Sequence, residues 1–188
     1  MIVKAILIII PVVVFGIFVA IIGYFNKFVK LKNLVRAAWS DIDVMLKKRH
    51  DLIPNLVETV RGAGAYEKST LERVIQARSS AMAAVSPADK GASEGMLTGA
   101  LKSLFALSES YPALKANENY LLLQNQIKEL EDSIEGQRKS YNAAVMNKNI
   151  LIESFPSNIV ASLFGFKRQE QFTLESPSTE RQSTQVKI

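Results

Sequence analysis

An uninterrupted apolar run near the N-terminus limits most strongly how this chain can fold. From Ala5 to Phe25 no side chain is charged, and an α-helix over these residues would be about 31 Å long at about 1.5 Å per residue. This length matches the hydrocarbon core of a bilayer. Pro11 and Gly16 are compatible with a spanning helix, because lipid forces the backbone groups to pair internally. The sequence predicts a transmembrane helix at residues 5–25, after a short extracytoplasmic end at residues 1–4.

A cleaved signal peptide is the alternative interpretation of this run. Signal peptides usually carry an apolar region of about 7–15 residues followed by a small-x-small cleavage site, and the chain shows neither feature. The absence of cysteine also excludes lipoprotein processing and leaves no disulfide. We therefore expect a retained anchor.

The charges beside the run predict its orientation. The first four charged residues after it are basic, and no acidic residue occurs before Asp41. The basic flank consists of Lys27, Lys30, Lys32 and Arg36. By the positive-inside rule, residues 26–188 lie in the cytoplasm and the N-terminus lies outside. We attribute the formal net charge of +5 to this membrane flank, because no concentrated basic stripe typical of a nucleic-acid-binding protein occurs elsewhere.

Helical periodicity dominates the rest of the chain. Apolar residues spaced by three and four positions follow the span, and a coiled-coil pattern runs from Tyr120 to Phe155. Residues 86–94 are interpreted as a loop, and Pro112 and Pro156 as further breaks. The fold class is therefore predicted as all-α: a transmembrane helix followed by an elongated antiparallel bundle of about four helices over residues 26–166. The polar segment 167–188 is predicted to be disordered.

The charged run Lys47–Asp51 interrupts the first stripe and leaves two interpretations. Asp51 could cap a new helix with Pro54 in its first turn, so that the chain turns back at His50, Asp51 and Pro54. Alternatively a kinked helix continues, because the four–three spacing can be threaded through the charged run. The start signals favour the turn. His50 is then expected to be solvated.

No motif in the sequence indicates catalysis or cofactor binding. The chain has no cysteine and only one histidine, and it contains no Walker A loop, G-x-S-x-G or H-E-x-x-H motif. Asp41 and Asp43 diverge on a helix and cannot share a proton. We therefore predict no enzyme activity, no catalytic residue, no metal or cofactor, no small-molecule substrate and no nucleic acid.

Two segments are candidate contact surfaces. The apolar piece after Pro156 could cap the bundle, lie on the bilayer surface or bind a partner. Its candidate surface residues are Phe155, Ile159, Val160, Leu163, Phe164 and Phe166. Gly62 and Gly64 could admit a neighbouring helix closely, and Trp39 is expected in the core.

Four ordered blocks of sequence resemble the bacterial LemA family. They are WSDIDVMLKKRHDLIPNLVETVRG, TLERVIQAR, YPALKANENYLLLQNQIKELE and RKSYNAAVMNKNILIESFPSNIVASLFGF. Departures fall at Met45, Tyr66 and Ala113, where the family usually has glutamine, histidine and aspartate. The resemblance implies a membrane-anchored antiparallel helical bundle with one N-terminal span. It supplies no catalytic residue.

From these features we predict a non-enzymatic scaffold or adaptor in the bacterial cytoplasmic (inner) membrane, crossing it once. We expect it to self-associate as a homo-oligomer and to contact membrane lipid, with a membrane protein as a further partner. The alternatives are a membrane-shaping protein that binds anionic lipids and a regulator of a membrane protease or signalling kinase.

Overall fold

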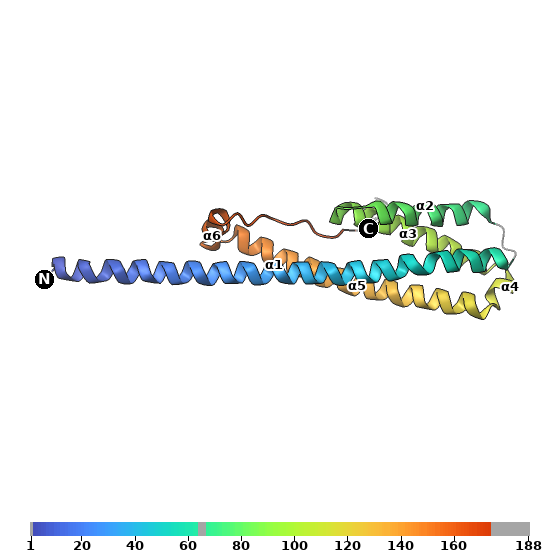
Figure 1. The fold of residues 1–188 in the computed structure, drawn as a ribbon, viewed down its shortest axis with the longest axis horizontal. Helices are drawn as coiled ribbons and strands as arrows, with labels where there is room; N and C mark the ends of the chain where they lie inside the picture. The colour runs from blue at the N-terminus through green and yellow to red at the C-terminus, as the bar shows by residue number, and fades with distance from the viewer. Residues whose placement is uncertain (1, 64–66, 174–188) are drawn as a thin grey trace, which may run out of the picture. The chain divides into compact units, whose positions relative to one another are not determined.

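The part of the chain that the computed structural model describes, residues 2–63 and 67–173, is mainly helical. The helices are α1 (Ile2–Gly62), α2 (Lys68–Ala83), α3 (Pro87–Ser108), α4 (Pro112–Lys115), α5 (Glu118–Glu153) and α6 (Ser157–Leu163) (Figure 1). The described residues contain no strand, which confirms the predicted all-α class. The predicted loop at 86–94 is wrong, because Ser86 caps α3 by accepting a hydrogen bond from the Asp89 N–H at 3.0 Å, with Pro87 in the first turn.

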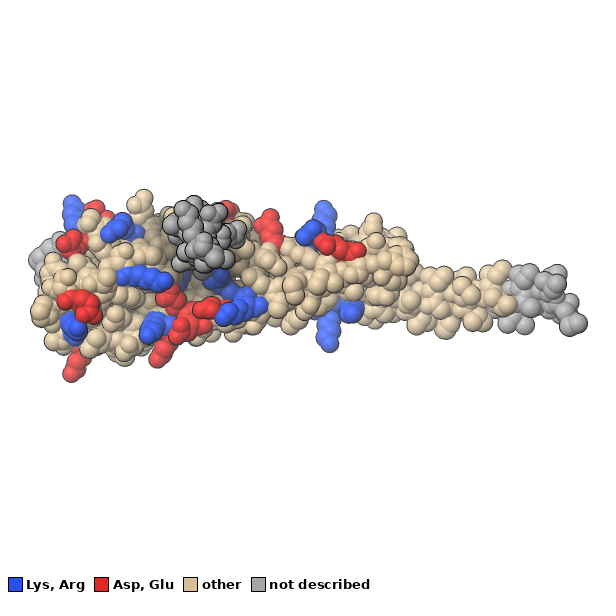
Figure 2. Space-filling view, turned by 180° about the vertical axis from the view of Figure 1, so that it is seen from behind, with Lys and Arg blue, Asp and Glu red and all other residues tan. Residues whose placement is uncertain are grey.

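The N-terminal part of α1 is a candidate membrane span. It contains an apolar window long enough to cross a bilayer, and none of that window is buried inside the protein. Figure 2 shows no charged side chain on the described surface of this helical segment, whereas lysine, arginine and acidic side chains lie over the rest of the visible face. An unburied apolar helix of this length is stable in lipid, where its backbone groups are paired internally.

The predicted turn at His50, Asp51 and Pro54 is wrong, because α1 continues through all three residues to Gly62. Pro54 has no N–H, so the carbonyl of His50 loses its intrahelical donor. The Nε of Arg78 on α2 donates to that carbonyl at 2.8 Å. Asp51 caps no helix and instead accepts a hydrogen bond at 2.6 Å from Lys47, one turn earlier on α1. The helix therefore tolerates proline here because another helix supplies the missing donor.

The chain divides into two compact units. The anchor unit comprises Met1–Trp39 and Ser140–Gln169, and the bundle unit comprises Ser40–Lys139 and Glu170–Ile188. Both α1 and α5 contribute one part to each unit.

The bundle unit has one apolar core to which α1, α2, α3, α4 and α5 all contribute. Its buried residues are Ile53, Leu56, Val57, Val60, Leu71, Val74, Ala81, Leu97, Leu101, Leu104, Leu114, Tyr120 and Ile127. Within this unit α2 and α3 run side by side in opposite directions (Figure 1). On α1, α2, α3 and α5 the spacing of these side chains by about one or two helical turns places them on one face, as an amphipathic helix requires.

The anchor unit has a smaller core. Phe28 on α1 packs with Leu151 of α5 and with Val160 and Ala161 of α6. Trp39, predicted in the core, lies with its ring centroid 5.2 Å from that of the buried Tyr141. This spacing is typical of a favourable aromatic pair.

The described part of the segment that follows α6, as far as residue 173, is held by side-chain contacts in both units. In the anchor unit, the side chain of Asn149 bonds to both backbone groups of Gln169, at 2.9 and 3.0 Å. In the bundle unit, Phe172 is 1% exposed, and the Arg138 guanidinium lies 5.0 Å from its ring centroid. The prediction of disorder is therefore wrong for 167–173, because these contacts hold the backbone. Residues 174–188 lie outside the described part of the chain.

Candidate functional site

Three ionisable side chains are buried together in the bundle unit. Arg49 and Glu94 are each 2% exposed and His50 is 8% exposed. One oxygen of the Glu94 carboxylate accepts a hydrogen bond from Arg49 Nη2, and the other lies 2.9 Å from His50 Nε2. The Nη1 of Arg49 donates to the hydroxyl of Thr98 at 3.1 Å. This buried cluster, Arg49–His50–Glu94, is the strongest candidate for a functional site.

The register of α1 and α3 brings these residues together. Arg49 falls between the buried Leu46 and Ile53, three residues after one and four before the other. Glu94 similarly precedes the buried Leu97 by three residues on α3. Both charged residues therefore stand in core positions of their own helices. His50, next to Arg49 on α1, is also buried, so the expectation that it is solvated is wrong.

The environment keeps the Glu94 carboxylate ionised. Burial raises its pKa, but the hydrogen bond from His50 and the charge of Arg49 outweigh this effect, so its pKa lies below the ordinary 4.5. An ionised carboxylate only accepts hydrogen bonds, which assigns a proton to Nε2 of His50. A carboxylate with a lowered pKa and both oxygens engaged is a weak general base.

The rim of the cluster is lined by further ion pairs. A cavity of about 270 Å³ beside His50 and Glu94 is also lined by Asp43, Lys90 and Asp51. Lys90 donates to the Asp43 carboxylate across α3 and α1. No group of three or more metal-binding side chains occurs among the described residues. The arrangement is suited to fixing α1 against α3, because the side-chain hydrogen bonds of Arg49 and His50 and the Lys90–Asp43 ion pair all join these two helices.

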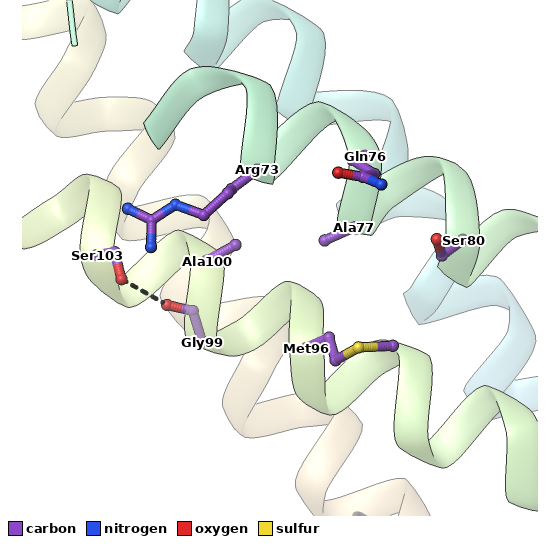
Figure 3. Close-up of a pocket in the computed structure, with 8 residues that line it drawn as sticks. All are labelled: Arg73, Gln76, Ala77, Ser80, Met96, Gly99, Ala100 and Ser103. Atoms are coloured by element: carbon purple, nitrogen blue, oxygen red, sulfur yellow. Dashed lines mark hydrogen bonds between the residues drawn. The ribbon is translucent and has the colours of Figure 1, made fainter. Parts of the chain in front are cut away.

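A second cavity, of about 450 Å³, lies between α2 and α3. Figure 3 shows Ala77 and Ala100 facing each other across it, with Arg73 at one end. The Arg73 guanidinium donates to Thr70 at 3.1 Å. The other lining side chains are small or uncharged, so this cavity provides no acid–base pair.

The structure separates the predicted contact residues into two sets. The basic flank residues Lys27, Lys30, Lys32 and Arg36 are all exposed on α1. Of the six candidates around α6, four are exposed and two pack inward; the exposed ones are Phe155, Ile159, Leu163 and Phe164, and the inward ones are Val160 and Phe166. Gly62 is exposed and a Cβ there would meet nothing within 4 Å, whereas Gly64 lies outside the described residues.

Arg49, Glu94 and Arg78 are site residues that were not predicted from the sequence. Glu94 lay in the segment predicted as a loop, although its spacing from the apolar residues that follow it on α3 was available as a signal. No local pattern marks Arg78 as the donor to the His50 carbonyl. That contact depends on how α2 packs against α1.

Comparison with known proteins identifies the relatives of this chain. The LemA family profile matches residues 38–188. Magnetosome protein MamQ 2 of Paramagnetospirillum magneticum is 28% identical over 174 residues, covering 79% of this chain and 64% of the relative. Magnetosome protein MamQ of Magnetospirillum gryphiswaldense is 26% identical with the same coverage.

Protein LemA of Metamycoplasma hominis is 28% identical over 144 residues, covering 74% of this chain and 64% of the relative. The chain thus spans about 64% of the length of these relatives. The profile match covers most of the chain and includes both α1 and α3 parts of the buried cluster. This protein is a member of the bacterial LemA family.

Proposed function

We propose that this protein is a non-enzymatic scaffold or adaptor that crosses the bacterial inner membrane once and self-associates. One observation carries the proposal: a single helix, α1, contains both the candidate span and four residues of the bundle core. No loop interrupts it. Such a helix links the anchor directly to a folded bundle, which is the construction expected of a protein that presents a surface at a membrane.

The buried cluster supports a structural role. Arg49 and His50 on α1 both form hydrogen bonds with the Glu94 carboxylate on α3. Breaking such a buried pair is costly, while its presence gives specific registry more than net stability. In this role the cluster fixes the position of α1 relative to α3.

The basic flank supports the orientation. Lys27, Lys30, Lys32 and Arg36 follow the apolar run and are exposed, as cytoplasmic flank residues usually are. In the proposed arrangement residues 26–188 face the cytoplasm. A membrane protein partner and a second copy of the chain are the expected contacts. Lysine side chains close to the bilayer would also attract anionic headgroups.

Site-specific photocrosslinking in native membranes tests the adaptor role. Ile75, Met82 and Met96 are exposed apolar residues on α2 and α3, and each is replaced in turn by a photoreactive phenylalanine analogue. Ser133, exposed on α5, is the matched control position. We expect discrete adducts with protein, including one at twice the mass of the chain, from at least one apolar position. Monomer alone from all three positions would contradict the proposal.

A double variant separates an adaptor from a catalyst. Arg49→Met with Glu94→Met removes both charges of the buried Arg49–Glu94 pair together, so neither partner of that pair is left alone. An adaptor carrying both substitutions should fold and give the same adducts as the parent chain. If the folded double variant loses its biological activity while its adducts are unchanged, the cluster acts chemically and the proposal fails.

A further inference from the structure

The segment Phe155–Phe166, which contains α6, packs against the end of the candidate span. Phe164 lies with its ring centroid 4.8 Å from that of Phe25, the last residue of the apolar run. Phe166 stacks on Phe28 at 4.6 Å, with the ring planes 16° apart. Figure 1 shows α6 beside α1, and these contacts confirm that the two are adjacent. The position of α6 along α1 is therefore fixed within the anchor unit.

One face of this segment is apolar and uncovered. Phe155 is 81% exposed, Ile159 59%, Leu163 69% and Phe164 48%. Ile159 and Leu163 are four residues apart on α6, and that spacing puts their side chains on one face. Large apolar side chains gathered in this way on a protein surface usually mark an interaction site.

Capping of the anchor-unit core does not use this face. Val160 and Ala161, which follow Ile159 on α6, are buried against Phe28 and make the cap. Capping of the anchor-unit core alone does not explain why the exposed side chains of Ile159 and Leu163 are apolar. The exposed face needs a second explanation.

The position of α6 along α1 indicates what covers the exposed apolar face of this segment. Ile21, Tyr24 and Phe25, in the last turns of the apolar run, pack against the same small core as α6. In a bilayer that holds residues 5–25, these turns lie where the hydrocarbon meets the headgroups. A basic residue follows this level on each segment, Lys27 on α1 and Lys167 just after α6, and both are exposed. Apolar residues backed by lysine at this depth are typical of an interfacial segment.

We propose that Phe155–Phe166 is a second membrane contact, lying in the interface of the same bilayer that α1 crosses. Ile159 and Leu163 enter the boundary between acyl chains and headgroups. Phe25 and Phe28 hold the segment at that depth from the protein side. This inference rests on the proposed membrane anchoring, because α1 sets the level of α6.

Lipid-quenching of single reporters tests the inference on the full chain. The chain contains no cysteine, so single substitutions give unique labelling sites. An environment-sensitive fluorophore is placed at Ile159→Cys or Leu163→Cys, with Val14→Cys as the span control and Ser133→Cys as the aqueous control. Each protein is reconstituted in phosphatidylcholine vesicles containing a minor fraction of phosphatidylglycerol. Nitroxide lipids labelled near the headgroup or deep in the acyl chain then serve as quenchers.

We expect Ile159→Cys and Leu163→Cys to be quenched at least several-fold more by the shallow nitroxide than Ser133→Cys is. We expect Val14→Cys to be quenched best by the deep nitroxide. If Val14→Cys is quenched and both α6 reporters behave like Ser133→Cys, the interfacial contact is overturned while the anchor stands. If Val14→Cys is not quenched, the anchor fails, and the inference fails with it.

A charge variant supplies an independent check. With the reporter at Ser162→Cys, the added pair Ile159→Asp and Leu163→Asp should reduce shallow quenching to the level of the aqueous control. The matched pair Ile75→Asp and Met82→Asp on α2 should leave it unchanged. Unaltered quenching after Ile159→Asp and Leu163→Asp would overturn the inference, provided that the melting temperature matches that of the parent. All four replaced side chains are exposed, so folding is expected to be preserved.

Discussion

Replacing Glu94 by glutamine should destabilise the protein strongly, because it leaves a buried arginine without an anion. Glu94 accepts hydrogen bonds from Arg49 and His50, and bonds to a charged group contribute about 1.5–3 kcal/mol each. Their sum, about 3–6 kcal/mol, agrees with the 3–5 kcal/mol typical of breaking a buried ion pair. A chain of this length loses about 2–4 °C of melting temperature per kcal/mol, so Glu94→Gln should melt about 6–20 °C lower.

Circular dichroism at 222 nm, recorded during heating of the full chain in detergent, measures this shift. Glu135→Gln is the matched control, since Glu135 is exposed and paired with Lys139 one turn away at 2.6 Å. Its melting temperature should stay within the error of the parent value. The double variant Arg49→Met with Glu94→Met should recover the part of the loss that comes from the unpaired Arg49. A Glu94→Gln protein that melts like the control would refute the assignment of Glu94 as the counterion of a buried arginine.

The same carboxylate gives the protein a pH dependence with a definite sign. The folded pKa of Glu94 is lowered, so between the folded value and the ordinary 4.5 the unfolded chain binds more protons at this site. The stabilisation is fully present above about pH 4.5 to 5 and is lost as the pH falls through the folded pKa. Glu94→Gln should therefore show a shallower fall in melting temperature below pH 5 than the parent. Parallel acid profiles for the two proteins would contradict this.

The remaining predictions concern single contacts. Arg78→Met should destabilise the parent by about 1.5–3 kcal/mol in urea unfolding, because the His50 carbonyl loses its donor, and should cost less in a Pro54→Ala background that restores the helical N–H. Equal losses in both backgrounds would show that the proline does not create the need for Arg78. Gly91→Val should release the segment ending at Thr173, whose backbone a Cβ at Gly91 would strike, and increase hydrogen exchange there. Unchanged exchange in that segment would contradict the contact, and Gly99→Val, which has open space, is its control.

The regular features of the fold could be predicted from the sequence. The apolar run and the heptad pattern of α5 are local and repetitive, so their spacing alone indicates helices. The basic flank residues after the run are exposed, and their place at a membrane surface stays a prediction.

The buried cluster could not be predicted from local pattern. A run such as Lys47–Asp51 is usually solvated, and only a partner on another helix makes burial of Arg49 and His50 favourable. That partner, Glu94, lies 45 residues after Arg49. The continuity of α1 could not be predicted from local pattern either. Pro54 is typical of a helix start, and the helix continues through it because Arg78 on α2 donates the hydrogen bond that the His50 carbonyl would otherwise lack.

The distance across the charged run tests most directly the central claim that one helix carries both the candidate span and the bundle core. Spin labels are placed at Val44→Cys and Glu58→Cys, two exposed positions on α1 separated by fourteen residues. A continuous helix puts their Cα atoms about 21 Å apart, on nearly the same face. A chain that reversed at His50 and Asp51 would bring them to about 10 Å, the spacing of packed neighbouring helices. Pulsed dipolar spectroscopy of the full chain in lipid nanodiscs should give a single distance near 21 Å, and strong short-range broadening from labels near 10 Å would contradict the account.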